Sequence, residues 1–281
     1  MPTFDTPAPI HATVDVITGD IRIVAGERHD TVVEVRPHDP SSEFDVRTAA
    51  QTRVEFADGK LLVKSPKPLS VYLTTRSTGV DVTVALPAGS QVKALTGQGD
   101  VRLEGTYGDC TVRTHHGDVL AHRTADLRAT TLHGRISVDR IAGDAQITGS
   151  GDVELTEVTG AARVKNLDGP SWIGHAGGDV SVNSAHGDIT IDRAGPRVVA
   201  RTAHGSVRLG EVARGAAVLQ TASGAIEIGV RKGTSAWLDV KSSSGTVHSE
   251  LTAGDGPAGG DETAEIRART LDGDILIRRA A

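Results

Sequence analysis

The chain has 281 residues, with 30 basic and 36 acidic side chains and a formal net charge of −6. This balance excludes the global basic field that nucleic-acid-binding and anionic-membrane-binding domains present. No apolar stretch approaches the ~20 residues of a membrane-spanning helix, so we expect neither nucleic-acid binding nor membrane insertion. The 33 glycines, with only 3 Phe, 2 Tyr and 2 Trp, favour short strands and tight turns around a thin core.

The first residues and the cysteine content predict a cytoplasmic protein. The segment MPTFDTPAPIHATVDV lacks the basic and then apolar regions of a secretory signal. The single cysteine, Cys110, provides neither a disulfide framework nor a metal-ligand spacing. We expect it to be a small buried side chain.

Residues 1–90 contain strand-like runs without a regular period. One piece, ITGDIRIV at residues 17–24, resembles a unit of the repeat that follows. Repeat proteins need atypical terminal units that cover an open edge. We therefore predict an N-terminal β cap over 1–90, with a divergent first coil inside it.

From about residue 91 to 281 one pattern recurs, Thr-x-polar-Gly-Asp-Val-x-Val. Successive anchor glycines are 17 to 28 residues apart, most often 18, and weaker copies fall about halfway between them. The anchors are Gly99, Gly117, Gly134, Gly151, Gly169, Gly187, Gly205, Gly224, Gly245 and Gly273. The unit is thus about nine residues, one short strand and one turn, and two units make one period.

Alternating apolar residues such as Val101 and Leu103 place one face of each strand inward. A single strand pair cannot bury that face, so stacked coils must complete the core. The sequence therefore predicts an all-β fold, a β-solenoid of about ten coils of ~18 residues. A Gly/Asp/Pro-rich stretch near 252–264 predicts a protruding loop, and Arg278 and Arg279 are expected to blunt the terminal edge.

A small hydrogen-bonding residue stands three positions before each anchor glycine, and we expect it to form a ladder between coils. The positions are Thr96, Thr114, Thr131, Thr148, Asn166, Ser184, Thr202, Thr221, Ser242 and Thr270.

Histidine precedes the anchor glycine in four copies, His116, His133, His186 and His204. Stacking with a period of eighteen brings neighbouring members to about 5 Å, close enough to share a metal or to couple protonation. The same column holds Gln98, Ser150 and Asp168 in other copies, which favours a solvated turn. The Asp that follows many of the glycines is likewise better explained by turn stabilisation than by calcium binding.

Other residues suggest no catalytic site. The sequence has no nucleophile elbow, metalloprotease helix or phosphate-binding loop. The aromatic residues Trp172 and Trp237 are expected to fill widenings of the core, and Tyr72 and Tyr107 have no aromatic neighbour in sequence. The stretch with Arg193, Arg197, Arg201, Arg208 and Arg214 is interleaved with acids and predicts a solvated face.

The repeated GD-[VI]-x-[VIL] units resemble the bacterial adhesin-like β-strand-repeat proteins of unknown function. The resemblance runs from ATVDVITGDIRIVAGERHDTVVEV through VDVTVALPAGSQV to LDGDILIRR, and actinobacterial members look most similar. It implies a β-solenoid without an established catalytic activity, and it supplies no catalytic or cofactor-binding residues.

Three hypotheses about function follow. The first is a non-enzymatic scaffold, with no cofactor, that binds a protein partner. The second is a structural rod that self-associates end to end. The third is a metal- or pH-responsive site, with a metal-dependent activity, at His116, His133, His186 and His204.

Overall fold

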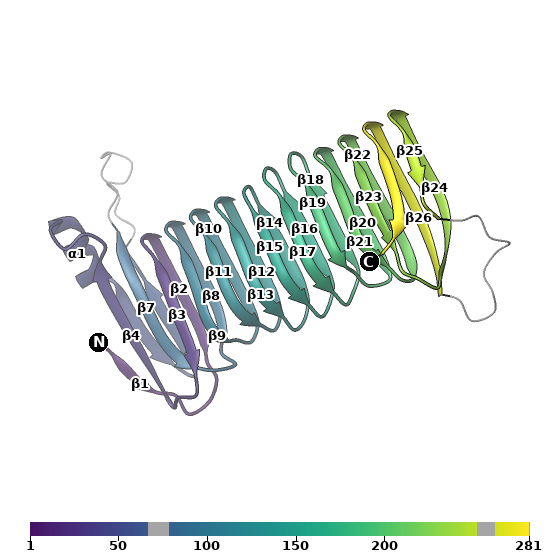
Figure 1. Cartoon of the computed structure of the whole chain (residues 1–281). Helices are drawn as coiled ribbons and strands as arrows, with labels where there is room; N and C mark the ends of the chain where they lie inside the picture. Colours follow the sequence, from purple (N-terminus) through teal and green to yellow (C-terminus); the bar gives the residue numbers. More distant parts are fainter. Residues whose placement is uncertain (67–78, 252–261, 281) are drawn as a thin grey trace. The chain divides into compact units, whose positions relative to one another are not determined.

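A computed structural model of the chain describes residues 1–66, 79–251 and 262–280 (Figure 1). The chain forms two compact units, Met1–Ala142 and Gly143–Ala281. Each unit consists almost wholly of β-strands arranged in two sheets, here called sheet A and sheet B of that unit. Within the described ranges no helix has the length and apolarity needed to cross a bilayer.

In unit 1 the two sheets are built from strands that alternate along the chain. The strands of sheet A, in order across the sheet, are β1 (Thr3–Asp5), β4 (Asp30–Pro37), β7 (Val80–Pro87), β3 (Ile21–Gly26), β9 (Val101–Thr106), β11 (Val119–Thr124) and β13 (Ile136–Ile141). Those of sheet B are β5 (Arg53–Ala57), β6 (Lys60–Lys64), β2 (His11–Thr18), β8 (Gln91–Gln98), β10 (Cys110–His116) and β12 (Leu127–His133).

Each coil is one strand of sheet B followed by one strand of sheet A, and successive coils pair in parallel. Thus β8 pairs with β10, and β9 pairs with β11, in both cases parallel. The inward side chains of these strands are buried, as Val101 and Leu103 are at 0% and 1% exposure. The predicted β-solenoid is confirmed, and its narrow interior explains why few aromatic residues are present.

The first coil is formed by β2 and β3, which pair in parallel with β8 and β9 of the next regular coil. The divergent unit ITGDIRIV therefore has the geometry of a regular coil. The strands β4 to β7 come between these two coils in the chain, but in the sheets they lie on the other side of the first coil, with β7 beside β3 and β6 beside β2. The predicted cap region, residues 1–90, thus contains a regular coil as well as inserted strands, and it belongs to unit 1 together with the coils that follow it.

The edges of both sheets in this cap are antiparallel strands. β5 pairs antiparallel with β6, and β1 pairs antiparallel with β4. The helix α1 (Glu43–Gln51) packs against β4 and β7. It begins at Ser42, whose hydroxyl oxygen accepts a hydrogen bond from the Asp45 backbone N–H, a regular N-cap. This helix is not among the elements predicted from the sequence.

Unit 2 repeats the same arrangement. Its sheet A contains, in order, β15 (Val153–Val158), β17 (Ser171–Ala176), β19 (Ile189–Arg193), β21 (Val207–Val212), β23 (Ile226–Val230), β27 (Ile275–Arg279) and β25 (Val247–Ser249). Its sheet B contains β14 (Ala145–Gly149), β16 (Ala162–Asn166), β18 (Val180–Ser184), β20 (Arg197–His204), β22 (Gly215–Ser223), β26 (Glu262–Asp272) and β24 (Thr234–Ser244).

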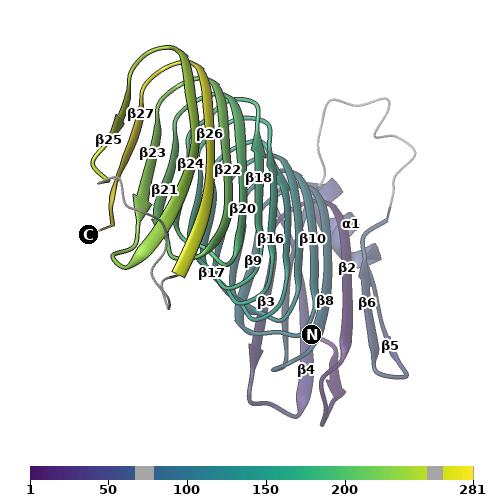
Figure 2. The ribbon, with the colours of Figure 1, turned by 90° about the vertical axis from the view of Figure 1, so that its right-hand side faces the viewer.

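The last two coils of unit 2 are out of chain order. The final strands β26 and β27 lie inside the stack, between β22 and β24 in sheet B and between β23 and β25 in sheet A (Figure 2). The expectation that Arg278 and Arg279 blunt the terminal edge is therefore wrong. Arg278 forms an ion pair with Glu227, and Arg279 donates to the backbone carbonyls of Arg231 and Thr234.

Apolarity explains this order. At matched inward positions the inserted coil carries Ile275 and Ile277, whereas the outer coil carries Val247 and Ser249. The outer coil also carries the serine run at the end of β24. The more apolar coil takes the inner position because burial there removes more apolar surface from water. Of the predicted loop near 252–264, residues 252–261 lie outside the described ranges, while 262–264 begin β26.

The anchor glycines allow coils to stack closely. Gly117 has φ +139°, and a Cβ built on it would lie 2.2 Å from the Gly99 carbonyl oxygen. We therefore expect Gly117→Ala to lower the free energy of unfolding by about 2–4 kcal/mol, measured by chemical denaturation.

The matched control for this change is Gly26→Ala in the same unit. A Cβ at Gly26 meets no heavy atom within 4 Å, so a change within about 0.5 kcal/mol is expected. Equal losses from the two variants would contradict the role assigned to the anchor position.

Candidate functional site

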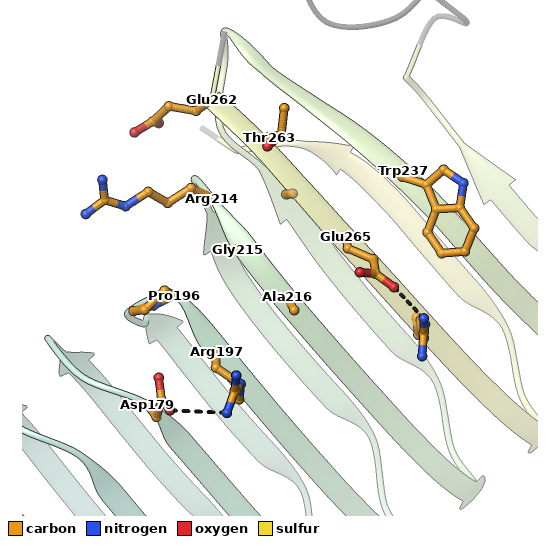
Figure 3. A pocket seen from close by; sticks show the side chains of 12 residues that line it. Asp179, Pro196, Arg197, Arg214, Gly215, Ala216, Trp237, Glu262, Thr263 and Glu265 are labelled. Atoms are coloured by element: carbon orange, nitrogen blue, oxygen red, sulfur yellow. Dashed lines mark ion pairs between the residues drawn. The ribbon is translucent and has the colours of Figure 1, made fainter.

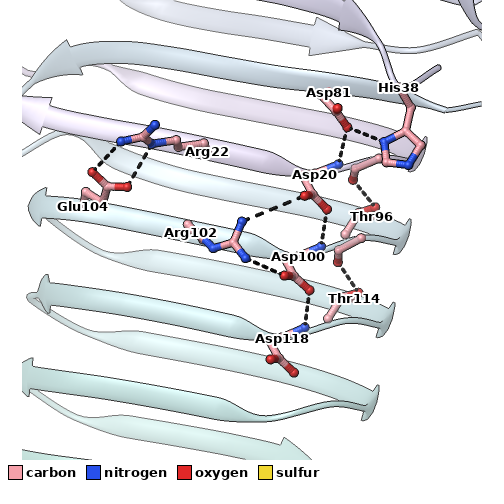
Figure 4. A network of polar contacts seen from close by, with 12 residues as sticks. Asp20, Arg22, His38, Asp81, Thr96, Asp100, Arg102, Glu104, Thr114 and Asp118 are labelled. Carbon is pink, nitrogen blue, oxygen red and sulfur yellow. Dashed lines mark hydrogen bonds and ion pairs between the residues drawn. The ribbon is translucent and has the colours of Figure 1, made fainter. Parts of the chain in front are cut away.

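The turns that follow the sheet B strands hold the most regular polar contacts of unit 1. The hydroxyls of Thr114 and Thr131 donate, at 3.2 Å, to the carbonyls of the anchor glycines Gly99 and Gly117 in the preceding coil. Thr96 donates at the same distance to Gly19, the equivalent glycine of the first coil. These threonines are buried, so each contact satisfies a polar group that has left water. Figure 4 shows the contacts of Thr96 and Thr114. The predicted ladder between coils is confirmed at these positions.

In unit 2 the ladder continues with changes of side chain. Thr202 and Thr221 donate to the Gly187 and Gly205 carbonyls, and the Asn166 amide donates to the Gly151 carbonyl. Thr148 is an exception to the prediction, because it lies exposed on the outer face of β14, where its register partner is Lys165. The shorter turn before Gly151 shifts the register by one residue and places Gly149 at the inward position.

The aspartates that follow the anchor glycines form a second ladder. In unit 1, Asp20 Oδ1 accepts from the Asp100 backbone N–H at 2.9 Å, and Asp100 Oδ1 accepts from the Asp118 N–H at 2.9 Å (Figure 4). Asp188 accepts from Ser206 in the same way in unit 2. These carboxylates hold the next turn in place, which supports turn stabilisation over calcium binding as their role.

The ladder of unit 1 begins at Asp81, which lies beside His38. Asp81 Oδ1 accepts from the Asp20 backbone N–H at 3.0 Å, and it lies 2.9 Å from His38 Nδ1 (Figure 4). The hydrogen bond and charge of Asp81 raise the pKa of His38. The hydrogen bond from the Asp20 backbone N–H to Asp81 joins the first coil to the inserted strands of the cap.

The four predicted histidines form two stacked pairs. The rings of His116 and His133 have centroids 5.0 Å apart with an interplanar angle of 14°. Those of His186 and His204 are 5.2 Å apart at 11°. The separation agrees with the predicted stacking, and all four side chains are exposed, as expected for a solvated turn.

This geometry is poorly suited to a shared metal. A neutral imidazole binds zinc through an in-plane lone pair with Zn–N near 2.0 Å. In two nearly parallel rings these lone pairs run side by side and do not converge. Moreover, over residues 1–66, 79–251 and 262–280 no group of three or more His, Cys, Asp or Glu side chains is placed to hold one ion.

Two buried groups of unit 1 have a structural role. Burial raises the pKa of the Cys110 thiol to about 12, so the reactive thiolate is disfavoured. Tyr107 is 3% exposed, and its hydroxyl donates to the Ile23 and Glu104 carbonyls at 2.6 and 2.9 Å. Burial also raises the pKa of Tyr107. Tyr72 lies outside the described ranges.

The expectation that Trp172 and Trp237 fill the core is wrong. Both lie on outward positions of their strands. Trp172 is half-buried, and its Nε1–H donates to Asp192 at 3.1 Å. Trp237 is 57% exposed. The alternation of the strands sets these positions, since the inward neighbours Ile173 and Leu238 are apolar.

The arginine-rich stretch divides between two faces of unit 2. Arg197 and Arg201 lie on the outer face of sheet B, in β20, whereas Arg193 and Arg208 belong to sheet A. The residues are close in sequence because each coil passes through both sheets. Their charges therefore do not add up to one patch.

An open groove of about 1040 Å³ crosses the outer face of sheet B in unit 2. Small residues such as Ala216 and Gly215 form its floor, while Trp237 lies at one end and Asp179 at the other (Figure 3). Arg267 forms an ion pair with Glu265 at 2.6 Å and lies 6.0 Å from the Trp237 ring centroid. This groove is not evident from the sequence, since its residues come from coils far apart in the chain.

Comparison with known proteins finds a matching family over nearly the whole chain. The family described as Toastrack DUF4097 matches residues 11–278. No curated protein matches the sequence.

Several solved structures are similar. A "putative adhesin" from Parabacteroides distasonis is 11% identical, with a TM-score of 0.39, and the match covers 98% of this chain and 95% of that one. A "putative adhesin" from Bacteroides fragilis is 15% identical, with a TM-score of 0.38 and coverage of 98% and 96%. A "putative cell adhesion protein" from Clostridium sporogenes is 9% identical, with a TM-score of 0.23 and coverage of 99% and 98%.

The histidine pairs yield a direct test. Because their lone pairs do not converge, we expect no stoichiometric zinc or other transition metal in the purified protein, as measured by elemental analysis. The variants His186→Ala and His204→Ala should give the same metal content as the unaltered chain. About one equivalent of metal that disappears in either variant would contradict this expectation.

Proposed function

This chain belongs to the Toastrack DUF4097 family, and we propose that it is a non-enzymatic, adhesin-like β-solenoid scaffold that binds a protein partner. The observation that carries the proposal is the groove on sheet B of unit 2, with the exposed Trp237 at one end. The partner would insert a side chain or a short segment against this ring.

The composition of the groove supports a protein ligand. Trp and Arg are the residue types most often responsible for binding energy at protein interfaces. Trp237, Arg197 and Arg267 provide both types, and Asp179 and Glu265 add acceptors of opposite charge. An exposed tryptophan has apolar area that remains unburied in the isolated chain, so a partner that covers it gains free energy.

The backbone supports rigid display of these groups. The floor strands β20, β22, β26 and β24 are joined by continuous parallel ladders, from Arg197 paired with Ala216 to Glu265 paired with Trp237. A rigid floor reduces the entropy lost on association. This is the property expected of a scaffold.

We also propose that the chain has no catalytic activity and lies in the cytoplasm. The first proposal is supported by the roles of its polar residues, since the aspartates and threonines of the turns are engaged with backbone groups. The second is supported by the free, buried Cys110, which is compatible with a reducing compartment.

The groove can be tested by partner capture. The unaltered chain, Trp237→Ala and the control Arg208→Ala on sheet A would each be used to capture proteins from native lysate, with quantification by mass spectrometry. We expect one partner that binds the unaltered chain and the control. With that purified partner, Trp237→Ala should cost about 2 kcal/mol or more of binding free energy.

Two results would contradict the proposal. One is a partner whose affinity is the same for the unaltered chain and Trp237→Ala. The other is a measurable turnover by the purified chain of a substrate bound in this groove.

Self-assembly is a second candidate, favoured by the edge strand β24. This strand has 11 residues and pairs on one side with β26. Its inward residues Leu238 and Val240 are half-buried, whereas Ile266 of the neighbouring coil is fully buried. A long edge with partly exposed apolar residues is a template for another strand.

Light scattering over a concentration series tests this candidate. If coils add at β24, the mean mass should rise with concentration, and Leu238→Lys should abolish the rise because it places a charge on the docking face. Asp239→Lys, on the outer face of the same strand, is the control. A monomer at every concentration would reject self-assembly.

A further inference from the structure

A row of basic and amide side chains crosses the outer face of sheet B in unit 2. The strand register places six exposed or half-buried residues side by side, one from each of six neighbouring strands. In order they are Lys165, Asn183, Arg201, Gln220, Arg269 and Lys241. We call this set the basic row.

The basic row contains no carboxylate, although the whole chain has a net charge of −6. The next row of the same face adds Arg163 and Arg267, with Asp239 as its acid. Asp239 accepts from Arg269 at 3.2 Å, and Arg201 Nε donates to Gln220 Oε1 at 3.0 Å. Cations therefore outnumber carboxylates over both rows, which favours an anionic ligand.

The surface is also concave at this place. An open groove of about 510 Å³ is lined by Arg201, Gln220, Arg269 and Lys241. It is separate from the groove at Trp237, which crosses the strands nearer to their N-terminal ends. A chain lying in it would run across the strands and follow the basic row.

The spacing of the cations selects among linear anions. Neighbouring strands are about 4.8 Å apart, so Lys165, Arg201 and Arg269, which stand on alternate strands, repeat every ~10 Å, while Lys241 stands on the strand next to Arg269. The amides of Asn183 and Gln220 occupy the strands between. A polysaccharide with a uronic acid at every second sugar presents its carboxylates over a comparable repeat, with hydroxyls between them.

We propose that the basic row binds a linear acidic polysaccharide that carries one carboxylate per disaccharide. Arginine forms two parallel hydrogen bonds to a carboxylate, and the amides between can donate to and accept from sugar hydroxyls. This ligand goes beyond the protein partner proposed for the Trp237 groove.

Other anionic polymers fit this surface less well. An extended acidic peptide points alternate side chains to one face every ~7 Å, out of step with the ~10 Å repeat. Single-stranded nucleic acid is bound through aromatic side chains on which the bases stack, and the basic row consists of cations and amides. A membrane-surface site combines cations with several large apolar residues that insert, whereas Leu271, which is 62% exposed, is the one large apolar residue that lines this groove.

The test uses a hyaluronan decasaccharide as the probe, titrated calorimetrically into the full chain at low ionic strength. We expect saturable binding, and about a tenfold or larger loss of affinity in the double variant Arg201→Gln/Arg269→Gln, with a weaker dependence on salt. The matched control is Arg193→Gln/Arg208→Gln, which removes the same charge from sheet A of unit 2. The control and Trp237→Ala should retain the affinity.

Comparison ligands decide whether the site is specific. Dextran of equal length should not bind, and oligo(dT), poly-glutamate and vesicles containing phosphatidylserine should bind more weakly than hyaluronan. The proposal is overturned if hyaluronan does not bind, if both double variants lose affinity equally, or if any of the other polyanions binds as tightly. Thermal unfolding of each variant shows whether a loss reflects misfolding.

Discussion

The close approach of successive coils at the anchor glycines is the constraint on which each unit depends. At these turns the backbone has positive φ, and a Cβ on Gly117 would lie 2.2 Å from the Gly99 carbonyl oxygen. Only a residue without a side chain allows the parallel strands on both sides of the turn to reach hydrogen-bonding distance. The threonine and aspartate ladders depend on this approach, because each spans from one turn to the next.

This constraint separates two kinds of position. Inward residues and turn residues are restricted by the neighbouring coil, so they recur as Val, Ile, Leu, Ala, Thr, Gly and Asp. Outward residues pair with the neighbouring coil through their backbone as well, but their side chains face solvent and can vary. The solvent-facing rows of unit 2 therefore differ in charge. One row contains Arg197, Ala216, Glu265 and Trp237 and carries both signs of charge. The basic row carries only cations and amides. Binding properties can change there without loss of the fold.

Much of the fold could be predicted from the sequence, because glycine and apolar residues recur along the chain with the period of the coils. The stacking of His116 on His133 also followed from the period alone. The prediction failed at Thr148, where one turn is shorter, and at Arg278, where the last coil lies inside the stack. It also missed α1, an insertion outside the repeat. In each case the chain departs locally from the repeat period, and the period therefore no longer predicts which residues become neighbours.

The sequence by itself determined the β-solenoid, the position of its turns and the burial of Cys110, since these depend on spacing within one or two coils. Only the tertiary structure decided which outward residues become neighbours. The strand register places Lys165, Arg201, Arg269 and Lys241 in one row, although they are far apart in the chain. Arg201 and Arg208 are close in the chain but lie on different sheets. The physical reason is that each coil crosses both sheets, so proximity on a face follows strand pairing and not sequence distance.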